Sequence, residues 1–237
     1  MYRKRLALVF AILCLLAQAG TVLAADQPVA DPKVAETFRQ AFPQVAFQEI
    51  YPSPIPGLYE VLAGNKVLYF APAGKHLLVG DLWDSQGRNL SRERINQVMS
   101  KKVADIPLQK ALKIGDGPKT VIEITDPDCP YCREASRFFS TRKDVTRYVF
   151  FFPLSIHPEA EAKARYILSS PEPSKAYEEV MTGQFDNKPL PEFKDNHQLE
   201  THHQITEWLG IQGTPNFWIN GVFISGANFQ TIEELLK

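Results

Sequence analysis

The chain has 237 residues, a hydrophobic content of 44%, a charged content of 22% and a formal net charge of −1. This composition is typical of globular proteins with a buried core, and the length allows one large domain or two small ones. The near-neutral charge argues against nucleic-acid binding, so we expect no nucleic-acid partner.

Residues 1–24 have the pattern of a secretory signal peptide. Three basic residues at positions 3–5 precede an apolar run over 6–16, and small residues permit cleavage after Ala24. The run is too short to span a membrane, and a core helix is the weaker alternative. Leu13 stands before Cys14 where a lipoprotein site would have a small residue. We therefore expect a periplasmic protein without stable membrane insertion, in an oxidising compartment.

Residues 25–88 are predicted to form a small N-terminal domain. A short amphipathic helix is expected over 31–42, followed by a proline-rich extended stretch at 51–57. The period of the apolar residues then changes to two, which predicts an antiparallel meander. Its three strands are expected at 58–63, 66–71 and 76–83.

Residues 89–113 are predicted to be a linker. The stretch 90–106 has the pattern of a helix that begins at Ser91 as N-cap, with an apolar stripe at Ile95, Val98 and Met99. Because most of its other positions are charged, the helix is a plausible connector between two folded regions.

Residues 114–237 are predicted to form a thioredoxin-type α/β domain. A β-branched strand at 120–125 leads into a cysteine motif that opens a helix, and an aromatic-rich strand follows at 147–155. The order of elements indicates a helical insertion over about 156–198. Further helices are expected at 158–170, 173–184 and 199–210, then a hairpin turning at Asn220-Gly221 and a C-terminal helix.

The motif Cys129-Pro130-Tyr131-Cys132 lies between a predicted strand and a predicted helix. The first turn of a helix carries unpaired N–H groups and the positive end of the helix dipole, which stabilise a thiolate. We therefore expect a lowered pKa for Cys129, and we expect Cys132, one turn further in, to resolve a mixed disulfide on Cys129. Pro130 suits the first helical position.

Other interpretations of the two cysteines remain open at this point. A structural disulfide closing so short a loop would constrain the unfolded chain little. A zinc site needs four ligands, and copper binding is supported only by the softness of thiolate ligands. The histidines that could join such a site, His197, His202 and His203, lack a metal-binding spacing and are better explained as surface or core residues. We expect neither a metal nor a cofactor.

Two further features favour redox chemistry. Glu123 alternates with Ile122 and Ile124 on the strand before the motif, so its side chain is expected on the opposite face, beneath the cysteines. A buried carboxyl group there would relay the proton of Cys132, while the alternative is a solvated carboxylate at the sheet edge. Pro215, in the segment GTPNF, is a candidate for a cis peptide bond.

These motifs together resemble the family of periplasmic disulfide isomerases DsbC and DsbG. The resemblance rests on DPDCPYC after a strand, on GTP farther along the chain, and on the N-terminal module containing VLYF and GKHLLVGDLWD. It covers nearly the whole chain after the signal peptide. It implies a cystatin-like dimerisation domain, V-shaped homodimers whose cleft binds misfolded or wrongly disulfide-bonded secreted proteins, and a membrane reductase of the DsbD type as partner.

The resemblance also implies roles for residues. Thr214 and Pro215 match the cis-proline loop that faces the cysteines, and with Pro130 and Tyr131 they are expected to contact substrate. The chain departs from the family in lacking a second cysteine pair and in carrying Glu123, which resembles the acidic residue of thioredoxin and the oxidase DsbA. The Pro130-Tyr131 dipeptide is that of DsbG, whereas Gly213-Thr214-Pro215 is closer to DsbC.

The first functional hypothesis is therefore an isomerase or reductase of non-native disulfides, with Cys129, Cys132 and Glu123 as catalytic residues. A dithiol oxidase is the second hypothesis, and the dimerisation module argues against it because the resemblance links that module to shielding the active sites. The third hypothesis is a holdase chaperone that binds unfolded chains without thiol chemistry.

Overall fold

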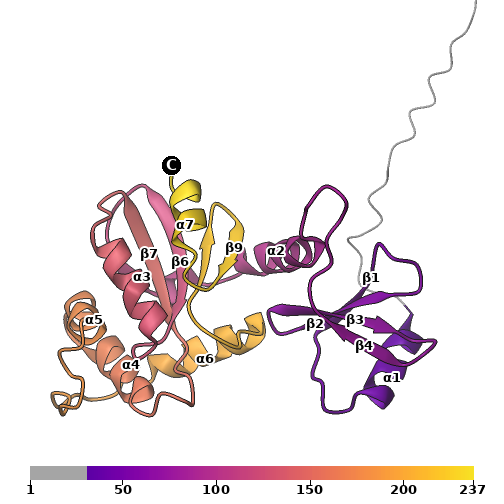
Figure 1. Ribbon diagram of the computed structural model, residues 1–237. Coiled ribbons are helices and arrows are strands. Elements are labelled where there is room, and N and C mark those ends of the chain that lie inside the picture. Colours follow the sequence, from indigo (N-terminus) through magenta and orange to yellow (C-terminus); the bar gives the residue numbers. More distant parts are fainter. Residues whose placement is uncertain (1–30) are drawn as a thin grey trace, which may run out of the picture.

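The structure is a computed structural model that describes residues 31–237, so the signal peptide expected over residues 1–24 lies outside the described residues. The described part contains a four-stranded sheet and a five-stranded sheet. Figure 1 shows helix α2 (Leu90–Val103) lying between the parts of the chain that carry these sheets. No helix within residues 31–237 is both long enough and apolar enough to cross a membrane.

The N-terminal sheet is antiparallel throughout, with the strand order β1-β2-β3-β4. Its core gathers around Phe38, whose ring makes edge-to-face contacts with Phe47 and Phe70. The predicted meander is confirmed, although β4 ends at Val79 rather than at residue 83, and β1 was not predicted as a strand. The elements are α1 (Pro32–Ala41), β1 (Glu49–Pro52), β2 (Tyr59–Ala63), β3 (Lys66–Ala71) and β4 (His76–Val79).

Helix α2 is held to the N-terminal sheet by polar contacts that are almost fully buried. Arg94 Nε donates to Glu60 Oε2 of β2 over 2.5 Å, and both side chains are less than 5% exposed. Ser91 is buried and accepts the N–H of Leu82, so it does not cap the helix as predicted. The N-cap is Asn89, whose side chain accepts the N–H of Arg92.

The other end of α2 contacts the C-terminal unit. The indole Nε1 of Trp218 donates to the carbonyl of Met99 over 3.2 Å, and both side chains are buried in one apolar cluster. The hydroxyl of Ser100 donates to the carbonyl of Gly221 in the hairpin. Helix α2 therefore has specific contacts with both sheets.

The C-terminal sheet has the order β5-β7-β6-β8-β9, in which β6 and β7 are parallel and every other neighbouring pair is antiparallel. The fold class is the predicted thioredoxin fold. Its first half contains η1 (Leu108–Lys110), β5 (Leu112–Ile114), β6 (Lys119–Thr125), α3 (Pro130–Ser140) and β7 (Val145–Phe151). Its second half contains α4 (Ala160–Ser169), α5 (Pro173–Met181), α6 (Gln198–Leu209), β8 (Asn216–Ile219), β9 (Val222–Ser225) and α7 (Phe229–Leu235).

Strand β6 carries different apolar clusters on its two faces, as its alternating pattern predicts. Val121 packs with Ala135 and Phe139 of α3, whereas Ile122 and Ile124 belong to the cluster on the opposite face. Helices α4 and α5 pack against each other and share one buried cluster with the two cysteines of the motif. Figure 1 shows these two helices beside α3. The segment between β7 and α6 therefore supports the region of the cysteines.

Candidate active site

The two cysteines lie at the junction of β6 and α3. Cys129 is the N-cap residue of α3 and is 4% exposed, whereas Cys132 is fully buried, and both thiols are free. Pro130 occupies the first helical position, where its missing N–H costs no hydrogen bond. The carbonyl of Cys129 accepts the N–H of Arg133 over 3.0 Å, so the helix begins at the motif itself.

The surroundings of Cys129 favour its thiolate. Hydrogen bonds lower the pKa of Cys129 to about 5, and the largest contribution comes from the Cys132 thiol. The backbone N–H groups of Cys132 and Tyr131 and a contact with Thr214 act in the same direction, whereas burial raises the pKa. Hydrogen bonds of this kind favour the charged form of the acceptor. Cys129 is therefore ionised at neutral pH.

The surroundings of Cys132 favour its protonated thiol. Burial and the neighbouring Cys129 raise the pKa of Cys132 far above its ordinary value, and the side chains of Thr214 and Thr125 oppose this only in part. The N–H of Asp126 lies 3.4 Å from Cys132 Sγ. The pair therefore combines one ionised thiol with one that keeps its proton.

The segment before β8 faces the motif. The Thr214-Pro215 peptide bond is cis, as the sequence predicted, and the carbonyl of Thr214 lies 3.7 Å from Cys129 Sγ. Tyr131 is 62% exposed and extends from the surface beside the buried cysteines. The structure thus brings Cys129, Cys132, Thr214 and Pro215 together and leaves the Tyr131 ring accessible.

Glu123 is fully buried on β6. Its Oε2 accepts from Arg147 Nη1 over 3.0 Å, and the same Arg147 atom donates to the hydroxyl of Tyr177 over 3.1 Å. Its other oxygen, Oε1, has no hydrogen-bond partner among the described residues. Arg147 was missed because it falls within the aromatic-rich run that predicted β7, and only its charge within that run could have identified it.

Asp126 is a second buried carboxylate that the sequence did not single out. Its Oδ1 accepts the N–H groups of Asp128 and Cys129 over 2.7 and 3.1 Å, and its Oδ2 accepts the N–H of Leu154 over 2.7 Å. Nδ1 of His157 lies 2.9 Å from Oδ2. Asp126 therefore links two segments by hydrogen bonds: the turn that contains Cys129, and the loop after β7.

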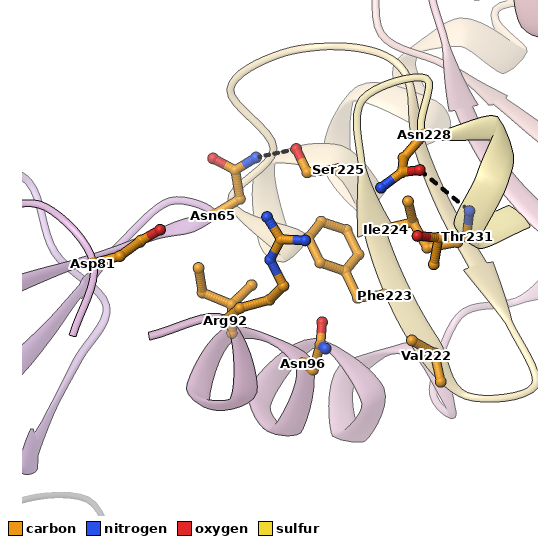
Figure 2. Close-up of a pocket in the computed structure, with 11 residues that line it drawn as sticks. Asn65, Asp81, Arg92, Asn96, Val222, Phe223, Ile224, Ser225, Asn228 and Thr231 are labelled. Carbon is orange, nitrogen blue, oxygen red and sulfur yellow. Dashed lines mark hydrogen bonds between the residues drawn. The ribbon is translucent and has the colours of Figure 1, made fainter. Parts of the chain in front are cut away.

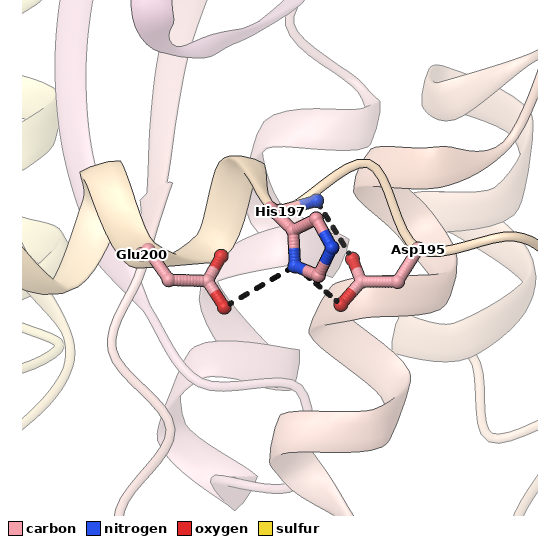
Figure 3. A group of neighbouring side chains, drawn as sticks. All are labelled: Asp195, His197 and Glu200. Carbon is pink, nitrogen blue, oxygen red and sulfur yellow. Dashed lines mark hydrogen bonds and ion pairs between the residues drawn. The ribbon is translucent and has the colours of Figure 1, made fainter.

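Two of the histidines considered as metal ligands, His202 and His197, lie in different surroundings. His202 is buried, where its Nδ1 accepts the N–H of Phe151 and its Nε2 lies 2.8 Å from the carbonyl of Lys110. Figure 3 shows His197 between Asp195 and Glu200, a group whose ligand atoms lie within 4.8 Å of one another. Arg165 donates to both carboxylates, so a cation there would compete with its guanidinium.

A pocket of about 240 Å³, lined by both polar and apolar side chains, lies away from the cysteines. Figure 2 shows it between the N-terminal sheet, α2 and the β9–α7 region, with Asn65 donating to Ser225 across it. None of its lining residues belongs to the cysteine motif or to the Thr214-Pro215 loop. The pocket is therefore separate from the candidate active site.

Comparison with known proteins shows two matching domain families. Residues 23–92 match the disulfide bond isomerase protein N-terminal domain, and residues 108–237 match a thioredoxin-like domain. The probable thiol:disulfide interchange protein DsbC of Bordetella parapertussis is 30% identical over 208 residues, which cover 86% of this chain and 72% of that protein. This chain belongs to the DsbC/DsbG family.

Two further members have lower coverage. The DsbG protein of Pseudomonas aeruginosa is 32% identical over 169 residues, which cover 65% of each chain. The DsbC protein of Escherichia coli is 26% identical over 183 residues, which cover 75% of each chain. Each is named a thiol:disulfide interchange protein, and membership of the DsbC/DsbG family accounts for the combination of an N-terminal module with a thioredoxin-like domain. The chain is accordingly a thiol:disulfide oxidoreductase.

Proposed function

We propose that the protein isomerises and reduces non-native disulfides in secreted proteins of the periplasm. The observation that carries this proposal is that the two thiols of the motif differ in protonation: Cys129 is ionised at neutral pH, whereas Cys132 is buried and protonated. An attacking thiol must be a thiolate, and a resolving thiol that keeps its proton gives the mixed disulfide time to rearrange.

The first step is attack of the Cys129 thiolate on one sulfur of a disulfide in the substrate protein, which we call the client. A bond forms between Cys129 Sγ and that sulfur, the client S–S bond breaks, and the second client sulfur leaves as a thiolate. The contact between Thr214 and Cys129 supports this step, and in this proposal the Thr214-Pro215 backbone pairs with an extended segment of the substrate. The exposed ring of Tyr131 offers an apolar contact beside it.

Two outcomes follow from the mixed disulfide. When a client thiolate attacks it, a new client disulfide forms, Cys129 is released as a thiolate, and no net electrons are transferred. When Cys132 attacks it, the client leaves with two more electrons and Cys129 and Cys132 become oxidised to a disulfide. That disulfide must then be reduced by a partner dithiol, for which we propose a membrane reductase of the DsbD type.

We propose that Glu123 accepts the proton that Cys132 loses in the second outcome. Glu123 and Thr125 point to the same face of β6, and the Thr125 side chain is one of the groups that act on Cys132. The free Oε1 of Glu123 is the acceptor in this proposal, while Arg147 holds Oε2. Glu123 thereby assists reduction more than isomerisation.

We further propose that residues 25–88 form a dimerisation domain and that the second copy pairs along β4. Strand β4 lies at the edge of its sheet, and Leu78 and Val79 are 55% and 78% exposed. An apolar groove beside it is lined by Ile55, Leu58, Tyr69 and Leu82 together with these two residues. An exposed apolar edge strand is a template for pairing with another chain. In the same division, residues 89–113 are the linker and 114–237 the catalytic domain.

The test compares wild type with Cys129→Ser and Cys132→Ser on scrambled ribonuclease and on insulin. We expect Cys129→Ser to lose both activities, and Cys132→Ser to lose insulin reduction while it retains part of the ribonuclease recovery. A holdase would suppress aggregation equally well with both cysteines replaced. A dithiol oxidase would be found mostly oxidised in cell extracts trapped with an alkylating agent, whereas an isomerase would be found mostly reduced.

A further inference from the structure

A cluster of charged side chains surrounds the cysteine motif. Asp128 precedes Cys129, and Arg133 follows Cys132. The Arg133 guanidinium binds Asp186 in bidentate geometry at 2.6 and 2.7 Å, and it donates to Asp128 Oδ1 over 2.9 Å and to the carbonyl of Pro127 over 2.7 Å. Arg133 therefore joins the turn before the nucleophile to the segment after α5.

Lys163 brings a second cation to this cluster from helix α4. It is 3% exposed, and its Nζ lies 2.6 Å from Asp128 Oδ1, 3.0 Å from Glu159 Oε2 and 3.2 Å from Asp186 Oδ1. Burial alone would lower the pKa of Lys163, but its hydrogen bonds to Asp128, Glu159 and Asp186 raise it above the ordinary value. A buried lysine with three carboxylate partners stays charged at neutral pH.

Asp128 is the residue directly before Cys129 in the chain, and a negative charge close to a thiolate opposes its ionisation. In this cluster two cations, Arg133 and Lys163, face three carboxylates, those of Asp128, Asp186 and Glu159. Glu159 is the most exposed of these carboxylates, with 57% of its side chain accessible, so solvent screens it most. The charge of Asp128 is thus offset mainly by the two cations that contact it directly.

We propose that Lys163 is a positioning residue of the active site, which holds Asp128 from helix α4 and keeps that carboxylate from opposing the Cys129 thiolate. The inference rests on the proposed function only in taking Cys129 as the attacking sulfur. It gives the helical insertion a part in tuning the nucleophile, in addition to its packing against the cysteines.

Other charged groups also face the turn, and they stay constant in the test. Asp126 lies within the turn, and His157 contacts it from the loop after β7. Glu123 and Arg147 lie on the sheet beneath. None of these residues is substituted, so a change in the ionisation of Cys129 reports on the cluster of Asp128, Arg133, Lys163, Asp186 and Glu159.

The experiment is a pH titration of thiolate absorbance near 240 nm in the reduced full-length protein. We expect the midpoint of Cys129 to rise by about 0.5 to 1 pH unit in Lys163→Met, because Asp128 loses one of its two cations. We expect it to fall by a similar amount in Asp128→Asn, and to return close to the wild-type value in the double variant.

Arg165 provides the matched control. It lies on the same helix as Lys163 but pairs with Glu161, Asp195 and Glu200 instead of the cluster. Arg165→Met removes the same charge from the protein, so its Cys129 midpoint should equal that of wild type. An equal rise in Arg165→Met and Lys163→Met would mean that only net charge matters and would overturn the proposal.

A Lys163→Met midpoint equal to wild type in a folded protein overturns the proposal as well. If Lys163→Met fails to fold, Lys163→Arg and Asp128→Asn decide: the first should keep the wild-type midpoint and the second should lower it. A midpoint in Asp128→Asn at or above that of wild type overturns the proposal. Because no client is present in the titration, a failure of the proposed isomerase function would show separately in the ribonuclease assay.

Discussion

At the scale of single residues, the chemistry depends on two sulfur atoms in different surroundings. The position of the motif at the start of a helix was enough to predict the direction of the Cys129 pKa shift and the deeper burial of Cys132. The largest contribution to that shift, the hydrogen bond from the Cys132 thiol, was not predicted. The roles of Asp126 and His157 were not predictable, since they depend on a loop after β7 that approaches the turn only in the folded chain.

Replacing Glu123 by Gln tests its proposed role in proton transfer. The amide keeps the shape of the side chain but cannot accept the proton of Cys132, so we expect the resolving step to slow by about tenfold or more. Insulin reduction should fall accordingly, while recovery of scrambled ribonuclease should fall less. Stopped-flow measurement of mixed-disulfide decay with a model client reports the step directly, and equal losses in both assays would contradict the role.

Cys132→Ala tests the cause of the low Cys129 pKa. The thiol of Cys132 supplies the largest stabilising hydrogen bond, and alanine removes it while leaving the backbone N–H groups in place. We expect the pKa of Cys129 to rise from about 5 but to stay below that of free cysteine. A thiolate titration of the variant measures this change, and an unaltered midpoint would assign the effect to the backbone alone.

At the scale of elements, the long periodic segments were predicted well and the short ones were not. Strand β5 has only three residues, and β1 ends in Pro52 at the start of a proline-rich stretch, so neither shows a clear alternation. The cap of α2 was assigned to Ser91 because serine favours N-caps, but its hydroxyl is engaged by Leu82 and Tyr69 of the N-terminal unit. That contact is tertiary and is not visible in the local pattern.

Helix α6 contributes a pH dependence of stability through His202. Burial lowers the pKa of His202 to about 4, whereas an unfolded histidine titrates near 6.5. Since the unfolded state takes up the proton first, the free energy of unfolding should decrease as the pH falls from about 6.5 towards 4, by about 3 kcal/mol in total.

Urea denaturation between pH 4 and 8 measures this dependence. His202→Asn should be less stable than wild type at pH 8, because it loses packing and a hydrogen bond, but its stability should change less between pH 6.5 and 4. Gln204→Asn, at an exposed position of the same helix, removes no titratable group and is the matched control that should retain the wild-type slope. An identical slope in His202→Asn and wild type would contradict the assignment.

At the scale of the whole molecule, helix α2 connects the thioredoxin-like domain, which carries the cysteine motif, to the N-terminal domain, whose edge strand β4 is exposed. The thioredoxin fold and the preceding meander were predicted from the order of the elements. The family comparison confirms the first, and the antiparallel strand order of the N-terminal sheet confirms the second. The contacts that fix α2 to each unit, such as Arg94 with Glu60, were not predicted because charge alone does not identify a buried partner.

The proposed dimer can be tested at strand β4 with Val79→Lys. Val79 is 78% exposed in the single chain, so lysine should leave the fold intact while it places a charge in the proposed interface. We expect sedimentation velocity to show a dimer for wild type and a monomer for the variant. Gln40→Lys adds the same charge on the exposed face of α1 and should remain dimeric, and a dimeric Val79→Lys would exclude pairing along β4.

The most direct test of the account is the pH dependence of iodoacetamide alkylation at Cys129 in the reduced protein, followed by mass spectrometry of the peptide that contains the motif. The account predicts a half-maximal rate near pH 5, with Cys132 unmodified at neutral pH. A half-maximal rate near pH 8.5, the value of a free cysteine, would contradict it.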